Sequence, residues 1–166
     1  MSLKIPVSVL VVIHTPVLDV LLLERARMPG YWQSVTGSVE RLDEPLEHTA
    51  LREVREETGI SVPPSDLLRW NVINTFRIWG QWSQRFAPGT THNTEHVFSL
   101  KVADRVSVTL TADEHLAYLW LPWREAAQKC FSWSNREAIE MLPARLRTAV
   151  AQMSVLGTGT ARRAAQ

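Results

Sequence analysis

The sequence predicts a single domain of the α/β class, in which strands and helices share one hydrophobic core. A chain of 166 residues suffices for one substantial core and is too short for two ordinary domains. Short β-branched or leucine-rich runs predict strands, and an amphipathic segment between them predicts a helix. We assign residues 1–153 to this domain and expect residues 154–166 to form a disordered C-terminal tail.

The N-terminal part of the chain is predicted to form strands. The apolar runs Val7–Ile13 and Val20–Leu23 are separated by a Thr-Pro pair, which predicts two neighbouring strands. A third short strand, Tyr31–Thr36, follows a Pro-Gly pair and leads the chain to Gly37. The sheet therefore begins within the first 40 residues.

A helix is predicted after this glycine. Asp43, Glu44 and Pro45 are typical of a first helical turn, and Gly59 is typical of a helix end. Between them, apolar residues recur at the four-residue spacing of one helix face: Leu46, Ala50 and Val54.

The second half of the chain is predicted to add strands and C-terminal helices. The strand-like runs are Asn71–Ile78, His96–Val102 and the shorter Ser107–Leu110. A helix opens near Ser134, and Pro143 is expected to bend or end it before a second helical stretch to about Met153.

Composition excludes several classes of protein. The formal net charge is +1, so no general field draws the chain to nucleic acid or to an anionic membrane. No apolar run is long enough to span a bilayer, and no cationic leader precedes the first strand, so we expect a cytoplasmic protein. The single cysteine, Cys130, excludes an internal disulfide and is expected to be buried. We predict no nucleic-acid, membrane or obligate protein partner.

Three glutamates near the end of the predicted helix suggest a metal site. Glu53, Glu56 and Glu57 are three and four residues apart, so they crowd one side of the helix and repel one another. They also lie at the negative end of the helix dipole, where carboxylates are unfavourable. A solvated charged face is one interpretation. A hard divalent cation such as Mg²⁺, which prefers carboxylate and phosphate oxygens, is the other.

The loop and helix together resemble the Nudix box. That motif is Gly, five residues, Glu, seven residues, then Arg-Glu-apolar-x-Glu-Glu-x-Gly-apolar, and here it runs from Gly37 to Ile60. One departure is that six residues, rather than five, lie between Gly37 and Glu44. The resemblance implies an α/β/α sandwich with a mixed sheet, and binding of Mg²⁺, with Mn²⁺ as an alternative ion.

The resemblance also assigns roles to residues of this helix. It makes Glu53 and Glu57 metal ligands, with Glu56 nearby as a further candidate ligand. It makes Arg52 the cation that holds the carboxylates in place, and these four residues form the predicted catalytic group. If the attacking water needs a general base, Glu56 is the nearest unassigned carboxylate in the sequence.

Six further segments carry a narrower resemblance: Pro6–Val12, Trp32–Glu40, Ala87–Gly89, Asn93–Glu95, Glu114–Tyr118 and Ser132–Arg136. They resemble the bacterial Nudix enzymes that remove pyrophosphate from dihydroneopterin triphosphate and leave the monophosphate. The similarity extends from Lys4 to about Ile139 and implies a small-molecule triphosphate substrate. It makes Glu114 a further metal carboxylate from outside the box. The positions that match substrate contacts are Lys4, Arg25, Thr36, Phe76, Arg77, Ile78, Trp79 and Ser132.

Each of these positions has a simpler interpretation. Lys4 and Arg25 could be ordinary surface charges rather than phosphate ligands, and Glu114 could be a helix-capping acid. The aromatic residues Phe76, Trp79, Trp82 and Phe86 could stack on a planar ring or pack in the core. Ser132 could contact the substrate or cap the following helix, for which Ser134 is better placed.

Rival functions share parts of the pattern. A broader nucleoside triphosphate pyrophosphohydrolase, acting on dATP or on oxidised nucleotides, would keep the metal site and differ in the base pocket. A non-catalytic Nudix domain that binds a nucleotide would not need the intact glutamates. His92, Glu95 and His96 match the spacing of inverted zinc proteases, but a predicted strand would hold the histidines about 13 Å apart.

Overall fold

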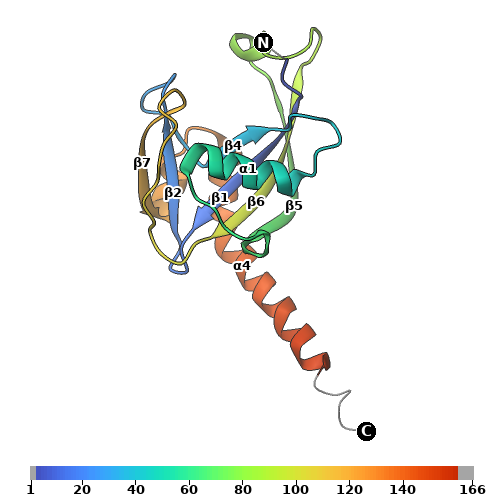
Figure 1. Cartoon of the computed structure of the whole chain (residues 1–166), viewed down its shortest axis with the longest axis vertical. Helices are drawn as coiled ribbons and strands as arrows, with labels where there is room; N and C mark the ends of the chain where they lie inside the picture. Colours follow the sequence, from blue (N-terminus) through green and yellow to red (C-terminus); the bar gives the residue numbers. More distant parts are fainter. Residues whose placement is uncertain (1–2, 161–166) are drawn as a thin grey trace.

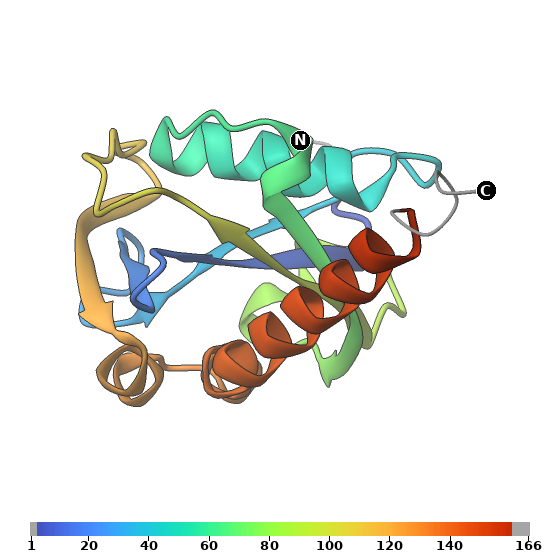
Figure 2. The same cartoon turned by 90° about the horizontal axis from the view of Figure 1, so that it is seen from below.

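The structure is a computed structural model that describes residues 3–160, with side chains to residue 149, and it has three layers. A seven-stranded sheet lies between α1 (Leu46–Thr58) on one face and α3 (Trp123–Lys129) with α4 (Trp133–Thr160) on the other (Figures 1 and 2). This is the α/β/α sandwich with a mixed sheet that the resemblance to the Nudix box implies.

The sheet is mixed because one of its strand pairs is parallel. Its main path runs β3 (Trp32–Gln33), β2 (Asp19–Arg25), β1 (Val7–His14), β6 (His92–Lys101) and β5 (Leu67–Arg77). β4 (Val35–Ser38) pairs with β1, and β7 (His115–Pro122) pairs with β2. The pair of β1 and β6 is parallel, whereas the others are antiparallel.

The apolar run of β1 is continuous because both of its faces are covered. Val9, Val11 and Ile13 belong to the core beneath α1, whereas Leu10 and Val12 belong to the core beneath α3 and α4. Successive side chains of a strand point to opposite faces, so one strand contributes to both cores.

The predicted helix is confirmed as α1. Pro45 is its N-cap, and Gly59 closes it with φ of 72°, a left-handed conformation that glycine adopts without strain. Ala50 and Val54 are fully buried against the sheet, as their spacing predicts.

β5 and β6 are present where strands were predicted, but each begins earlier than the predicted runs Asn71–Ile78 and His96–Val102. Two other strand predictions are wrong in detail. Tyr31–Thr36 forms two short strands, because the chain leaves β2 for β1 at Ser34, whose N–H is 3.3 Å from the Asn135 Oδ1. The segment Ser107–Leu110 forms no strand: its alternate apolar side chains pack on the core beneath α1, but its backbone joins no ladder. The alternating apolar residues of this segment therefore reflect packing on the core and not membership of the sheet.

The C-terminal region differs most from the prediction. β7 and α3 were not predicted, and α4 is one helix that continues through Pro143. Its early turns are fixed by burial of Ala138, Ile139 and Leu142, and each further residue extends a helix that is already nucleated. The backbone is thus helical to Thr160, where a disordered tail was expected from residue 154; residues 161–166 lie outside the described part of the chain.

The short helix η1 (Pro64–Asp66) precedes β5, and the loop between β5 and β6 carries the short helix α2 (Gly80–Ser83). α2 lies beside the N-terminal segment at one end of the molecule (Figure 1), where the Lys4 N–H donates to the Arg85 carbonyl at 2.7 Å.

Within the described residues, no helix is long and apolar enough to cross a membrane.

Candidate active site

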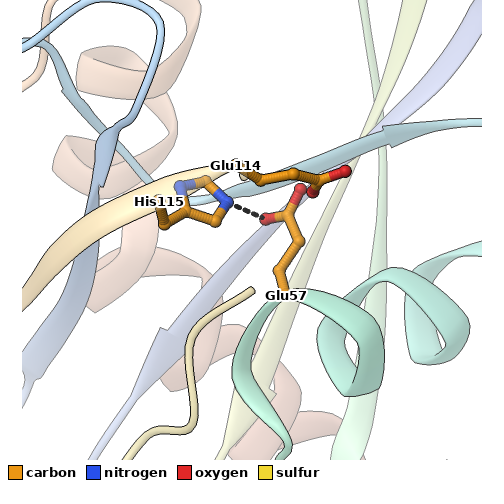
Figure 3. A group of neighbouring side chains, drawn as sticks. All are labelled: Glu57, Glu114 and His115. Carbon is orange, nitrogen blue, oxygen red and sulfur yellow. Dashed lines mark ion pairs between the residues drawn. The ribbon is translucent and has the colours of Figure 1, made fainter. Parts of the chain in front are cut away.

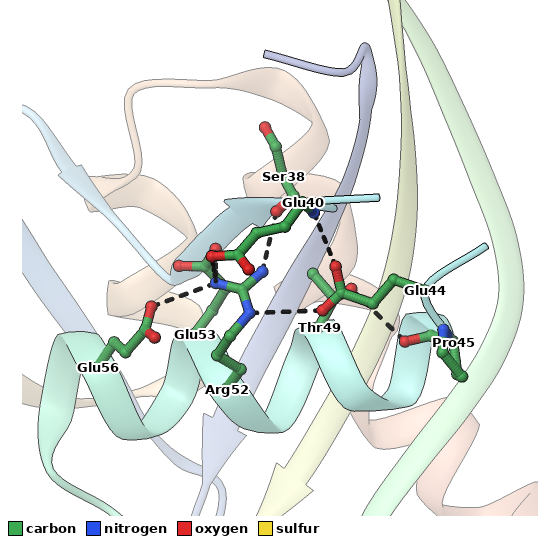
Figure 4. Close-up of polar contacts among 8 residues, drawn as sticks. All are labelled: Ser38, Glu40, Glu44, Pro45, Thr49, Arg52, Glu53 and Glu56. Carbon is green, nitrogen blue, oxygen red and sulfur yellow. Dashed lines mark hydrogen bonds and ion pairs between the residues drawn. The ribbon is translucent and has the colours of Figure 1, made fainter. Parts of the chain in front are cut away.

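Arg52 organises the carboxylates of α1 and the preceding loop (Figure 4). Its Nη1 lies 2.9 Å from Glu53 Oε1 and 3.2 Å from Glu56 Oε2, and its Nε lies 3.4 Å from Glu44 Oε1. Its Nη2 donates to the Ser38 carbonyl at 3.0 Å. A planar guanidinium with five N–H donors can serve several acceptors at once. One side chain therefore joins the glycine loop to the helix.

The extra loop residue leaves both ends of the motif in place. Glu44 caps the loop, because its Oε2 accepts the Glu40 N–H at 2.7 Å while its Oε1 faces Arg52. Arg41, Leu42 and Asp43 are exposed, so the additional length is accommodated in solvent.

Glu53 is pressed against Gly37. A Cβ on residue 37 would overlap the Glu53 carboxyl group, so glycine is needed here for close approach rather than for an unusual φ. Burial, together with the nearby Glu57 carboxylate, raises the pKa of Glu53 to about 7. A cation beside Glu53 would favour the ionised form of this carboxyl.

Glu57 is the centre of a second group of side chains, drawn in Figure 3. It is 4% exposed, and burial raises the pKa of its carboxyl. His115 Nε2 lies 3.3 Å from Glu57 Oε2, without the alignment of a hydrogen bond, so both atoms are buried without a hydrogen-bond partner. One ligand atom each from Glu57, Glu114 and His115 lie within 4.8 Å of one another.

These residues fit a divalent cation. Buried polar atoms without partners are uncommon and call for a ligand or ion that satisfies them. Two carboxylates supply the oxygen ligands that Mg²⁺ and Mn²⁺ prefer, and an imidazole nitrogen is also accepted by the transition metals. The orphaned Glu57 Oε2 is therefore explained by a cation at this position.

The four carboxylates predicted as metal ligands do not all gather at one point. Glu57 and Glu114 do, with Glu53 one turn away on the buried side of α1. Glu56 is outside that group: its side chain is 52% exposed and pairs with Arg52. Adjacent residues on a helix point in different directions, and here the Glu56 side chain extends toward Arg52 and solvent whereas that of Glu57 is buried.

His115 was not singled out as a site residue from the sequence. It follows Glu114 directly, within a segment already matched to the family, but a lone histidine carries no spacing signal. Its role depends on β7, which brings it beside α1.

A cavity of about 910 Å³ opens beside this group of carboxylates. Glu57, Glu114 and His115 line one part of it. All eight residues matched to substrate contacts line it as well: Lys4, Arg25, Thr36, Phe76, Arg77, Ile78, Trp79 and Ser132. Segments far apart in the sequence thus converge on one hollow.

The two cations in the cavity are partly desolvated. Burial lowers the pKa of Lys4 and of Arg25. Arg25 Nη1 donates to Gln33 Oε1 at 2.7 Å, while its Nε is buried without a partner. Desolvated cations with unused donors are suited to bind an anion.

Aromatic side chains cover another part of the cavity. Phe76 lies at the end of β5, and Trp79, Trp82 and Phe86 belong to the loop that carries α2. Trp79 is 69% exposed, which argues against core packing for that residue. Ser132 both lines the cavity and accepts the Asn135 N–H at 3.4 Å, so it caps α4 in place of Ser134.

A buried polar surface, to which the sequence analysis assigned no substrate role, completes the cavity. Its members are Ser8, Asn93, Glu95, Ser134 and Asn135, all buried. They come from β1, β6 and the first turn of α4. His92 and His96 lie on the extended strand β6, as predicted, so they do not form a zinc protease site.

Comparisons with known proteins show which family the chain is similar to. A model of the NUDIX domain matches residues 4–142. A dihydroneopterin triphosphate diphosphatase of Escherichia coli K12 is 45% identical over 140 residues, which cover 82% of this chain and 91% of that protein. The enzyme of the same name from Haemophilus influenzae is 37% identical over 136 residues, or 80% of this chain and 84% of that protein.

The solved structure of the E. coli dihydroneopterin triphosphate pyrophosphohydrolase superposes with a TM-score of 0.77 and 42% sequence identity. The match covers 85% of this chain and 97% of that chain. The NUDIX domain model matches most of the sequence, and the E. coli relative is 45% identical over 82% of the chain. The chain therefore belongs to the Nudix hydrolase family.

Proposed function

We propose that this enzyme hydrolyses dihydroneopterin triphosphate to dihydroneopterin monophosphate and pyrophosphate, with Mg²⁺ as its metal. One observation carries the proposal: a single cavity joins the carboxylate group of Glu57 and Glu114 to an aromatic and polar surface. Its volume is within the range of small-molecule sites. The relatives of the same name support the choice of substrate.

The phosphate chain is expected to lie at the charged part of the cavity. Lys4 and Arg25 can neutralise phosphate oxygens there, which a protein of net charge +1 must do locally. Arg25 remains charged at all relevant pH values, and its unused Nε–H can donate to a phosphate oxygen.

Glu53, Glu57 and Glu114 are the residues that would hold the metal, with His115 beside Glu57. A bound divalent cation supplies charge neutralisation at the phosphate oxygens and lowers the pKa of water. Arg52 keeps Glu53 in position and fixes the loop through the Ser38 carbonyl. Gly37 leaves room for the Glu53 carboxyl.

The protein contribution to the reaction is positioning and charge. Lys4 and Arg25 would hold the phosphate chain in place and stabilise charge on the pyrophosphate as it leaves, and the buried carboxylates would hold the metal beside it. Glu56 as general base stays a prediction; its side chain is 52% exposed and pairs with Arg52. The expected cytoplasmic location also stays a prediction.

Product analysis tests the proposal. The purified protein is incubated with Mg²⁺ and, separately, dihydroneopterin triphosphate, dATP and 8-oxo-dGTP, and pyrophosphate and orthophosphate are measured. The highest kcat/KM for the pterin, with pyrophosphate as product, is the expected result. A higher kcat/KM for a nucleotide would keep the reaction and overturn the substrate, whereas hydrolysis of none would overturn the enzymatic proposal.

A further inference from the structure

Glu95 is a buried carboxylate that the metal site does not use. It lies on β6, is 5% exposed, and lines the cavity on its polar surface. Asn74 Nδ2 donates to its Oε1 at 3.3 Å, and the Ser134 hydroxyl also donates to the carboxylate. Among the described residues, no lysine, arginine or histidine forms an ion pair with it.

A purely structural role for this group would be unfavourable. A buried carboxylate without a cation has a high desolvation cost, and here burial raises the pKa of Glu95. An ionised carboxylate has about four acceptor positions, and the protein fills two of them. The remaining acceptor capacity faces the cavity.

The neighbouring polar groups are already engaged within the protein. Asn93 Nδ2 donates to Ser8 Oγ at 2.7 Å. Asn135 Oδ1 accepts from the Ser34 N–H at 3.3 Å and from Cys130 Sγ at 3.4 Å. Glu95 is the one carboxylate among the five residues of this polar surface, and an ionised acceptor forms stronger hydrogen bonds with N–H donors than a neutral amide oxygen does.

An aromatic ring lies one step along the sheet from Glu95. In the ladder between β5 and β6, Asn74 is opposite Glu95 and Phe76 is opposite Asn93. Positions two apart along a strand share a face, so Phe76, Asn93 and Glu95 lie on the same side of the sheet. A planar heterocycle against the Phe76 ring would bring its edge toward the carboxylate.

We propose that Glu95 is the specificity residue for the heterocycle, and that its carboxylate accepts hydrogen bonds from the ring N3–H and the 2-amino group of a 2-amino-4-oxopyrimidine ring. These two adjacent donors match the two oxygens of one carboxylate. This assignment rests on the proposed function, because the pterin of that substrate carries this ring. Guanine presents the same pair of donors, whereas adenine presents a donor beside an acceptor.

The substitution Glu95→Gln separates recognition from structure. Glutamine keeps the shape but replaces one acceptor by an NH₂ donor, which opposes a ring N–H of the pterin. The same amide can accept from the 6-amino group of adenine and donate to its N1, a pairing worth about 1–3 kcal/mol. The variant should therefore change substrate preference rather than reduce all activity.

The experiment measures kcat and KM with dihydroneopterin triphosphate and with dATP, for the wild type and for Glu95→Gln. We expect kcat/KM for the pterin to fall roughly 10- to 100-fold, mainly through KM, while that for dATP is unchanged or higher. The matched control is Glu140→Gln, the same change at an exposed position on α4. Equal losses for both substrates, or no loss, would overturn the proposal.

Binding measurements keep the proposal testable if turnover fails. Isothermal titration calorimetry with dihydroneopterin monophosphate and with dAMP gives the same comparison without catalysis. If the wild type binds the pterin but does not hydrolyse its triphosphate, the proposed function is overturned. The role of Glu95 is then decided by the affinities of wild type and Glu95→Gln for dihydroneopterin monophosphate and dAMP. If Glu95→Gln does not fold, the wild type is tested instead with dGTP and with dITP, which lacks the 2-amino group. A ratio of the two kcat/KM values near one would overturn the proposal.

Discussion

The α-carbon of Gly37 lies directly against the carboxyl group of Glu53, so that even a methyl group on residue 37 would overlap it. The glycine loop and the metal-binding helix are therefore fitted to each other at one point of contact. Glu53 lies beside Glu57, and the pKa of each of these two carboxyls is raised.

Gly37→Ala should displace Glu53 and impair turnover while the protein remains folded. We expect kcat to fall on the order of 100-fold, because small displacements of a catalytic group have effects of that size. The measurement is kcat with saturating Mg²⁺, together with Tm. Gly80→Ala is the control, since a Cβ there meets no atom within 4 Å; equal activity of both variants would contradict the fit.

Glu57→Gln should abolish most turnover and also the stabilisation of the protein by Mg²⁺. Loss of a metal ligand is expected to exceed the roughly 10- to 100-fold effect of changes around a metal site. Without Mg²⁺, the variant should unfold at an equal or higher Tm, because the neutral amide avoids the desolvation of a buried carboxylate. Glu56→Gln, at an exposed position, should have the smaller effect; the reverse order would show that Glu56 is the essential carboxylate.

Arg52→Lys should weaken the connection between the glycine loop and α1. A single ammonium group cannot replace contacts to Glu53, Glu44 and the Ser38 carbonyl. We expect kcat to fall about 10-fold and the free energy of unfolding to fall by about 1–2 kcal/mol. Arg55→Lys, an exposed change on the same helix, is the control and should leave both quantities near the wild-type values.

The stability of the metal-free enzyme should fall as pH rises. The pKa of Glu53 is raised from 4.5 to about 7 in the folded state, so between these values the folded state holds a proton that the unfolded state has lost. The contribution of Glu53 to the free energy of unfolding therefore decreases as pH rises through this window, whereas the lowered pKa values of His14 and His96 act in the opposite direction. Thermal unfolding in EDTA at pH 5 and at pH 7.5 measures the effect, and Glu53→Gln should show a smaller decrease than the wild type.

Mg²⁺ should oppose this decrease, because cation binding requires deprotonated ligands and becomes tighter as pH rises. The Tm difference between samples with Mg²⁺ and with EDTA should thus be larger at pH 7.5 than at pH 5. An equal difference at both values would exclude titratable carboxylates as the ligands.

Cys130 should be inert in the folded protein. Its side chain is buried, and burial raises the pKa of the thiol to about 12, so almost no thiolate forms at neutral pH. Ellman's reagent is expected to label it only after denaturation. Rapid labelling under native conditions would show that the region around α3 and α4 opens readily.

Local sequence determined α1 and its chemistry. The spacing of Leu46, Ala50 and Val54 predicts a helix face, Gly59 supplies its end, and neighbouring positions supply the carboxylates and Arg52. These features depend on residues within one or two helical turns, where spacing alone fixes which side chains meet. The family resemblance, carried by the same segment, led to the sandwich fold that the structure has.

Only the tertiary structure decided which distant groups complete the site. His115 meets Glu57 across 58 positions of sequence because β7 pairs with β2 beside the end of α1, and β7 was not predicted. Glu95 meets Asn74 through the register of β5 and β6, and Ser134 because α4 packs across the sheet. Such contacts depend on strand pairing and layer packing, which no local spacing encodes, so the polar part of the cavity became visible only in three dimensions.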